Sequence, residues 1–227
     1  GNRLSLHTKL VLRVTGILLL AGTLAVLGLE LSNPASLKPL TWGGKLLGAV
    51  FQGITPRTAG FNTLDIGKLR DGTLFVMIIL MFIGASPGST GGGIKTTTFG
   101  VLLAAIISTA RGRSDVEMHE RRLPPDDIMK AMTIATLAMG LVTGVTLVLS
   151  VTENARFLEL LFETTSAFGT VGLTMGITPS LSDIGRIFIM ATMFMGRVGP
   201  LTVMMALAQR KRQPSTVHLA EERVLIG

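Results

Sequence analysis

Long apolar runs separated by short polar segments make up most of this chain. A run of about 20 apolar residues is long enough to cross a bilayer as an α-helix. Three runs reach that length with few charged residues, and each predicts a membrane-spanning helix: Leu10–Leu31, Ile128–Val151 and Ile184–Ala208. The expected fold class is therefore an all-α membrane protein.

A further apolar stretch is interrupted by glycine. Thr73–Ile83 begins a helix and Thr96–Ala110 resumes one, but Gly84–Lys95 between them reads Gly-Ala-Ser-Pro-Gly-Ser-Thr-Gly-Gly-Gly-Ile-Lys. Glycine lowers helix stability through backbone entropy, and proline removes a helix hydrogen bond. We therefore expect a membrane helix that is broken by an intramembrane loop.

Two other apolar stretches are too short to span a membrane. Leu46–Ile54 leads into Thr58-Ala59-Gly60-Phe61, and Phe157–Phe168 leads into Thr170-Val171-Gly172-Leu173. Each pattern predicts a re-entrant half-helix followed by an extended segment. Such backbone is tolerated at membrane depth only where it is buried in protein or lines a cavity.

The order of elements recurs along the chain. One offset of 112 residues relates several pairs: Thr58 and Thr170, Gly60 and Gly172, Leu69 and Leu181, Asp71 and Asp183, Gly84 and Gly196. We therefore expect two tandem, parallel copies of helix, pore loop and helix. The predicted divisions are residues 1–112 for the first copy, 113–125 for a cytoplasmic loop, 126–212 for the second copy and 213–227 for a C-terminal tail.

Composition and charge agree with a membrane protein. Hydrophobic residues make up 48% of the chain and charged residues 15%, against about 25% charged in soluble domains. The net charge of +7 is concentrated in Arg3–Arg13, Arg111–Lys130 and Arg210–Arg212. The positive-inside rule places these segments and both termini in the cytoplasm. This clustering between apolar runs argues against nucleic-acid binding, and the absence of cysteine excludes disulfides and thiolate metal sites.

The two Thr-x-Gly segments suit ion permeation. Dehydrating a potassium ion requires oxygens around a narrow axis, and backbone carbonyls supply them without a full negative charge. Glycine allows the backbone angles that such a strand requires. If only one such segment were present, a glycine-containing turn between two helices would be the simpler interpretation. The candidate filter residues are Thr58, Ala59, Gly60, Phe61, Thr170, Val171, Gly172 and Leu173. The carbonyls of residues 58–60 and 170–172 are the expected potassium ligands.

The sequence resembles one known family over nearly its whole length. Thr55–Thr63 and Ser166–Thr174 look like the third and fourth pore segments of the Trk/Ktr/HKT potassium-transporter superfamily. Gly84–Lys95 is similar to that family's intramembrane loop and is the most specific motif. Members have four such repeats around one pore, whereas this chain has two. The resemblance therefore implies half of a pseudo-fourfold, potassium-channel-like pore.

The glycine-rich loop has three interpretations. A phosphate-binding loop needs its lysine directly after glycine, but Ile94 separates Gly93 from Lys95, and the flanking segments are membrane helices. A simple helix break is the structural alternative. The resemblance implies a flexible gate below the filter, with no bulky packing to hold it in place. The candidate gating residues are Gly84, Ser86, Pro87, Gly88, Ser89, Gly91, Gly92, Gly93, Lys95 and Arg197.

Arg197 lies in the middle of the last predicted span. A guanidinium near the bilayer centre costs about 2.5 kcal/mol or more, so it should face a cavity or find a partner. We expect it near the start of the loop, hydrogen-bonded to loop carbonyls or to Ser86 and Ser89. Snorkelling to the cytoplasmic interface is the alternative. The resemblance implies an electrostatic barrier below the filter.

Potassium uptake across the membrane is the predicted function, and we find no pair of nucleophile and base that would indicate an enzyme. An ion-coupled transporter of potassium with sodium or protons is one alternative, but the acidic residues fall in loops or at helix ends. A non-conducting scaffold of the same fold is another. The resemblance implies a bacterial inner-membrane homodimer with potassium as substrate and no covalently bound cofactor. It also implies a cytosolic nucleotide-binding subunit of the RCK/KTN type, for which Arg111–Lys130 and the basic tail are candidate docking surfaces.

Overall fold

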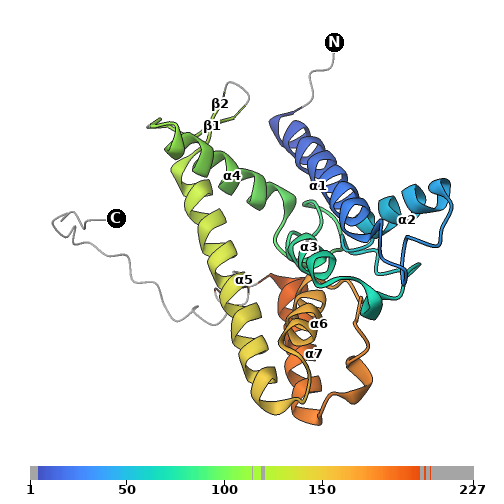
Figure 1. Ribbon diagram of the computed structural model, residues 1–227. Helices are drawn as coiled ribbons and strands as arrows, with labels where there is room; N and C mark the ends of the chain where they lie inside the picture. Colours follow the sequence, from blue (N-terminus) through green and yellow to red (C-terminus); the bar gives the residue numbers. More distant parts are fainter. Residues whose placement is uncertain (1–4, 114, 119–120, 200–201, 203–204, 206–227) are drawn as a thin grey trace.

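The computed structural model describes residues 5–113, 115–118, 121–199, 202 and 205. Its helices are α1 (Leu6–Glu30), α2 (Trp42–Ile54), α3 (Asp71–Phe82), α4 (Thr96–Ala110), α5 (Pro125–Thr152), α6 (Phe157–Gly169) and α7 (Asp183–Val198), with short 3-10 turns at Ile66–Lys68 and Thr178–Ser180 (Figure 1). Two short strands, β1 (Glu117–Met118) and β2 (Arg121–Arg122), pair in an antiparallel hairpin. The mainly helical fold is as predicted, and the small hairpin is an addition within the predicted loop.

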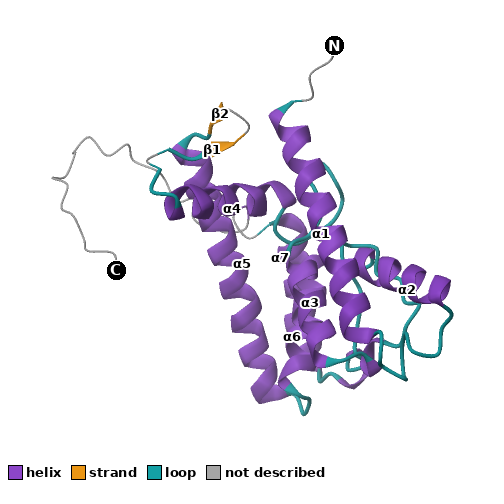
Figure 2. Cartoon of the chain, turned by 45° about the horizontal axis from the view of Figure 1, so that its top comes forward, coloured by secondary structure: helices purple, strands orange, loops and turns teal. Residues whose placement is uncertain are grey.

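Within the described residues, two helices are long and apolar enough to cross a membrane. They are α1, with 25 residues, and α5, with 28, and they contain the first two predicted spans almost entirely. Helices α3 and α4 are shorter and apolar, and they are separated by the glycine-rich loop as expected. The start of α1 and the β1–β2 hairpin lie at one end of the molecule, and the turn between α5 and α6 lies at the other (Figures 1 and 2).

The prediction of one continuous helix over Ile184–Ala208 is wrong, because the helix ends in the middle of this range. Helix α7 ends at Val198, and Gly199 leaves the helix with a φ of 94°. Pro200 follows in the sequence, and proline has no N–H to donate to a preceding turn. Thr202 and Met205 are helical again, whereas the other residues beyond Gly199 lie outside the described part.

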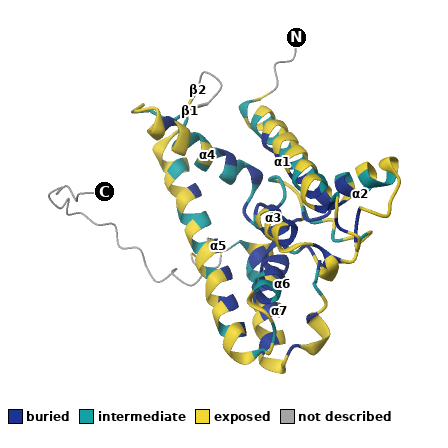
Figure 3. Cartoon of the chain, viewed as in Figure 1, coloured by how far each residue is buried: buried dark blue, intermediate teal, exposed yellow. Residues whose placement is uncertain are grey.

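The core lies where α3 and α6 pack together, and the outward faces of α1, α2 and α5 are largely exposed (Figure 3). Leu74, Met77 and Met81 of α3 pack against Phe162 of α6. Val171 and Leu173 belong to the same buried cluster: Ile66, Leu69, Leu74, Met77, Ile78, Met81, Phe162, Val171 and Leu173. Each fully buried side chain of this size contributes about 1.5–3 kcal/mol. The segment that follows α6 is therefore anchored in the core.

A buried carboxylate joins the end of α1 to the start of α3. Glu30 is fully buried, and its side chain accepts hydrogen bonds from the Arg70 N–H at 2.9 Å and from the Thr73 hydroxyl. Asn33 Nδ2 donates to the same carboxylate at 2.6 Å, and the Ser36 hydroxyl also donates. A negative charge at a helix N-terminus is favourable, so Glu30 holds the chain that enters α3.

A second carboxylate does the same for α7. Glu153, directly after α5, accepts from the Ser182 N–H at 2.9 Å and from the Ser182 hydroxyl, and Ser182 is the N-cap of α7. Arg70 and Ser182 are 112 residues apart, but Glu30 and Glu153 are 123 apart. The sequence offset therefore related the two helix starts and missed the two acids that hold them.

Replacing Glu153 with glutamine should lower stability and flatten its dependence on pH. The Ser182 hydroxyl and N–H stabilise the carboxylate and lower its pKa from the ordinary 4.5. Because the folded pKa is lower, this stabilisation is present above pH 4.5 and is lost as the pH falls through the folded pKa. We expect Glu153→Gln to cost about 1 kcal/mol near neutral pH and little in acid, measured as thermal unfolding in detergent.

The matched control for this change is Glu117→Gln. Glu117 forms an exposed ion pair with Arg113, and such pairs contribute little to stability. An unchanged unfolding midpoint at neutral pH in Glu153→Gln would contradict the proposed role of the carboxylate.

Candidate functional site

The two predicted filter segments, residues 58–61 and 170–173, adopt matching backbone conformations. Thr58 has a φ of 68° and Gly60 of 72°, and their counterparts Thr170 and Gly172 have φ of 52° and 89°. Positive φ is a genuine outlier for a β-branched residue such as threonine. Two strained threonines therefore occupy the same register of the two segments, although Thr170 directly follows α6 and Thr58 lies four residues after α2.

Hydrogen bonding in these segments uses the donors and leaves the acceptors open. The N–H groups of Ala59 and Gly60 donate back to the Thr55 carbonyl at 3.2 and 3.1 Å. In the second segment, the N–H groups of Thr170 and Val171 donate to the last turn of α6 at 3.0 and 2.9 Å. Among the described residues, none donates a hydrogen bond to the carbonyls of residues 58–60 or 170–172.

Phe61 differs from the other predicted filter residues. Its carbonyl accepts the Thr55 hydroxyl at 2.6 Å, and its side chain is 71% exposed. Thr55 is buried, and the sequence analysis gave it no role of its own. The first segment therefore keeps three open carbonyls, at residues 58–60, and secures the fourth to the end of α2.

The two filter segments lie side by side. A Cβ atom at Gly60 would overlap the carbonyl of Val171, so only glycine allows this approach. Both segments follow the C-terminal ends of short helices, where the helix dipole gives a partial charge of about −0.5. The end of α6 is enclosed, with every residue from Phe162 to Gly169 buried. The arrangement brings open carbonyls and two partly negative helix ends together.

The glycine-rich loop, for which no bulky packing was expected, is held by hydrogen bonds. Ile83 and Ile94 form a parallel bridge, in which the Ile94 N–H donates to the Phe82 carbonyl at 3.1 Å. Lys95 Nζ donates to the Gly91 carbonyl at 2.6 Å. These bonds use mainly backbone groups, which glycine supplies as well as any other residue. The loop is therefore closed at its base and braced by one lysine.

The C-terminal part of the loop, Gly91–Gly93, docks on the end of α6. The Gly93 N–H donates to the Phe168 carbonyl at 3.2 Å, and the Gly92 N–H donates to Thr170 Oγ1 at 2.8 Å. A Cβ at Gly91 would lie 2.7 Å from the Thr58 side chain, and one at Gly196 would overlap the Phe168 carbonyl. The loop therefore meets both filter segments at their first residues, whereas α7 meets the end of α6.

Arg197 lies near the loop without bonding to it. It is exposed and lines a cavity of about 170 Å³ together with Gly93 and Lys95. The predicted bonds from Arg197 to loop carbonyls, Ser86 or Ser89 are absent among the described residues. Ser86 Oγ instead accepts the hydroxyl of Thr96, the first residue of α4, at 3.1 Å, and the Ser89 hydroxyl donates to the Ser86 carbonyl at 2.6 Å. Lys95 is the cation that holds the loop.

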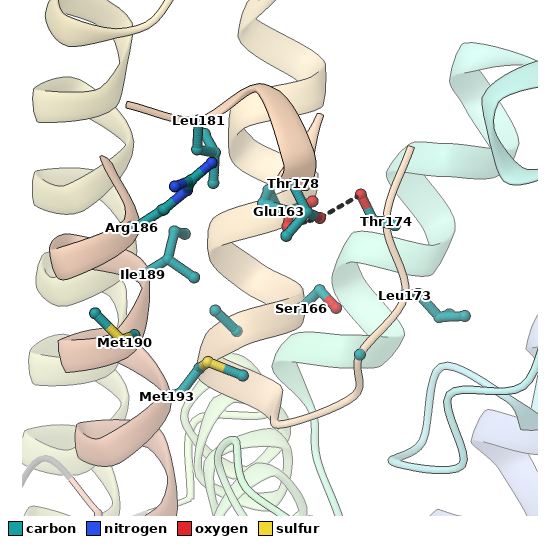
Figure 4. A pocket seen from close by; sticks show the side chains of 12 residues that line it. Glu163, Ser166, Leu173, Thr174, Thr178, Leu181, Arg186, Ile189, Met190 and Met193 are labelled. Carbon is teal, nitrogen blue, oxygen red and sulfur yellow. Dashed lines mark hydrogen bonds between the residues drawn. The ribbon is translucent and has the colours of Figure 1, made fainter. Parts of the chain in front are cut away.

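A buried acid lies behind the second filter segment. Glu163 lies in the middle of α6 and is 6% exposed; its Oε1 accepts the Thr178 hydroxyl, and its Oε2 has no partner among the described residues. It lines a largely apolar pocket of about 400 Å³ between α6, α7 and residues 172–181 (Figure 4). The expectation that acidic residues occur only in loops or at helix ends is therefore wrong. A glutamate inside the short apolar helix was the signal for it.

Comparison with known proteins identifies the family. The profile of TrkH, described as a cation transport protein, matches residues 2–219. Ktr system potassium uptake protein B of Bacillus subtilis is 44% identical over 223 residues, which are 98% of this chain and 50% of the relative. The potassium/sodium uptake protein NtpJ of Enterococcus hirae is 36% identical over 231 residues, 100% of this chain and 51% of the relative.

A solved structure has the same fold. The potassium transporter TrkH from Vibrio parahaemolyticus matches with a TM-score of 0.71 at 19% identity, covering 86% of this chain and 43% of that one. The chain thus spans about half the length of the curated relatives that it matches.

Gly196→Ala should destabilise the contact between α7 and the end of α6. The added methyl group would overlap the Phe168 carbonyl, and backbone gives way less easily than a side chain. Overpacking of this kind costs about 1–3 kcal/mol, which thermal unfolding in detergent would detect. Gly140→Ala in α5 is the control, because nothing lies within 4 Å of its added methyl group. Equal unfolding midpoints for the two variants would contradict the close contact.

Proposed function

The chain belongs to the TrkH family of cation transport proteins, and from this membership we propose that it forms two walls of a potassium-conducting pore. The relatives are named potassium uptake proteins and are about twice as long as this chain. A preceding half with two more helix, pore loop, helix units would supply the remaining walls. Potassium is then the substrate, and no chemical step is needed.

One observation carries the proposal. In each filter segment two amide N–H groups donate back toward the end of the preceding short helix, and no described residue donates to the carbonyls of residues 58–60 and 170–172. An open carbonyl at membrane depth is costly unless it finds a partner, and a dehydrated cation is such a partner. The positive φ of Thr58, Gly60, Thr170 and Gly172 supports this arrangement by turning both segments in the same way.

The ion would pass the docked loop to reach the cytoplasm. The segment Gly84–Lys95 lies against the first residue of each filter segment, with Lys95 and Arg197 close by. These positive groups oppose a cation, so conduction requires the loop to move aside. Flux would follow the electrochemical gradient, to which an inside-negative potential contributes about 2.3 kcal/mol per charge per 100 mV.

Assembly and orientation extend the same proposal. The start of α1 and the β1–β2 hairpin lie at one end of the molecule, which supports a shared cytoplasmic side in a bacterial inner membrane (Figure 2). The basic segment Arg111–Lys130 at this end would dock a cytosolic nucleotide-binding subunit of the RCK/KTN type. A homodimer with one pore in each protomer completes the proposed assembly.

An ion-coupled transporter is the second candidate, and Glu163 favours it. A buried carboxylate with one oxygen lacking a partner among the described residues is a common feature of proton or cation coupling sites in membranes. If this candidate is right, rubidium uptake will depend on a pH or sodium gradient, and Glu163→Gln will remove that dependence. Uptake that responds only to the membrane potential and the potassium gradient would contradict it.

Gly172→Ser should weaken the selection of potassium over sodium. Gly172 has a φ of 89° with no atom within 4 Å of an added Cβ, so the substitution fits sterically and strains the backbone. Strain of about 1–3 kcal/mol would move the neighbouring carbonyls out of register. The measurement is the permeability ratio of the whole protein in proteoliposomes, together with growth at low potassium of a strain lacking uptake systems.

Gly176→Ser is the matched control. Gly176 also has positive φ, 106°, and open space around it, but it lies beyond the filter segment. We expect its permeability ratio to equal that of the parent. An unchanged ratio in Gly172→Ser, or equal changes in both variants, would reject the filter assignment.

A further inference from the structure

One amide joins the glycine-rich loop to the second filter segment. The Gly92 N–H donates to Thr170 Oγ1 at 2.8 Å. The backbone of Thr170 is held at positive φ by its own N–H, which donates to the Ala167 carbonyl. A Cβ at Gly92 would lie 2.8 Å from the Phe168 carbonyl and from Thr170 Cγ2. The bond therefore exists only while the loop is docked at this close distance.

The docked loop makes Thr170 a poorer ligand for a cation. A hydroxyl oxygen has two lone pairs, and the Gly92 N–H occupies one and sets the positive end of an amide dipole beside it. Lys95 adds a full positive charge to the docked loop through its bond to the Gly91 carbonyl at 2.6 Å. A cation at the loop-facing end of the filter would meet both, and like charges disfavour one another in a medium of low dielectric constant.

The equivalent threonine of the first filter segment lacks this bond. Thr58 lies beside Gly91, where an added Cβ would come within 2.7 Å of its side chain. Among the described residues, no N–H donates to Thr58 Oγ1. The loop therefore touches both threonines and bonds with only one of them, so the chain contains its own matched control.

We propose that Thr170 couples the loop to the filter, so that loop docking and potassium binding at the loop-facing end of the filter weaken each other. The inference rests on the proposed function and concerns the regulation of that same site. Coupling between two sites is reciprocal, so potassium must weaken docking by the factor by which docking weakens potassium binding. Potassium arriving through the filter would thereby favour release of the loop that blocks its exit.

The accessibility of the loop tests this coupling. The chain has no cysteine, so Ala85→Cys introduces its only thiol. Ala85 is half-buried, and Gly91 covers it so closely that a Cβ at Gly91 would lie 2.6 Å from Ala85 Cβ. The experiment measures the rate at which a water-soluble maleimide modifies this thiol in the whole protein, otherwise free of cysteine. Modification should be about fivefold faster in potassium than in N-methyl-D-glucamine, at the lower end of usual coupling.

Substitutions at the two threonines separate coupling from simple loss of ion binding. Thr170→Val removes the bond to Gly92, so the rate in N-methyl-D-glucamine should rise and the potassium effect should vanish. Thr170→Ser should keep the potassium effect, and Thr58→Val should leave the rate in N-methyl-D-glucamine unchanged, because no described N–H donates to Thr58 Oγ1. Equal rates in the two cations for the parent would overturn the proposal. So would an unchanged rate in N-methyl-D-glucamine for Thr170→Val, because a filter that had merely lost potassium binding would behave in that way.

A loop-side variant keeps the test decisive if Thr170→Val does not fold. Gly92→Ala adds a methyl group too close to the Phe168 carbonyl, so its modification rate should be high and independent of potassium. A slow, potassium-sensitive rate in Gly92→Ala would contradict the proposal. Rubidium uptake by the same preparation distinguishes failure of the proposed function from failure of the coupling. If there is no uptake, the proposed function fails. If there is uptake but the modification rate of the parent does not depend on potassium, only the coupling is overturned.

Discussion

The carbonyl of Phe168 lies near the end of α6, where a helix leaves its last acceptors without partners inside the helix. The Gly93 N–H supplies one partner at 3.2 Å, and the surrounding space admits only glycine at Gly92 and Gly196. This one acceptor thereby brings the loop, α7 and the second filter segment together. If α6 ended differently, neither the docked loop nor the open carbonyls beyond it would be held in place.

The same physical rule, that backbone polar groups need partners at membrane depth, explains the two filter segments. Two N–H groups of each segment donate to carbonyls at or next to the end of the preceding short helix, and the segments' carbonyls are the proposed ligands of a cation. Two carboxylates, Glu30 and Glu153, hold the N-terminal ends of α3 and α7 by accepting hydrogen bonds from the residues that precede these helices. The two copies then differ on the loop-facing side, where Gly92 bonds with Thr170 and has no such bond with Thr58. The proposed coupling between the loop and the second filter segment rests on this difference.

Much of this architecture could be predicted because hydrophobic length and glycine clusters mark membrane helices and their breaks. The two spanning helices, the broken helix and the turns at Thr58 and Thr170 all left such signals. The end of α7 was missed because a long apolar run outweighed Gly199 and Pro200. The bonds of the loop were missed because backbone groups carry no residue-specific signal. The paired caps were missed because Glu153 lies 123 residues after Glu30, outside the 112-residue offset.

The central claim is that a dehydrated cation binds the open carbonyls of the two filter segments. Anomalous scattering from thallium, a potassium substitute, in crystals of the whole protein tests this most directly. The account predicts thallium peaks within coordination distance of the carbonyls of residues 58–60 and 170–172, and their loss when sodium replaces thallium. Thallium bound only elsewhere, for example beside Glu163, with no peak at these carbonyls, would contradict it.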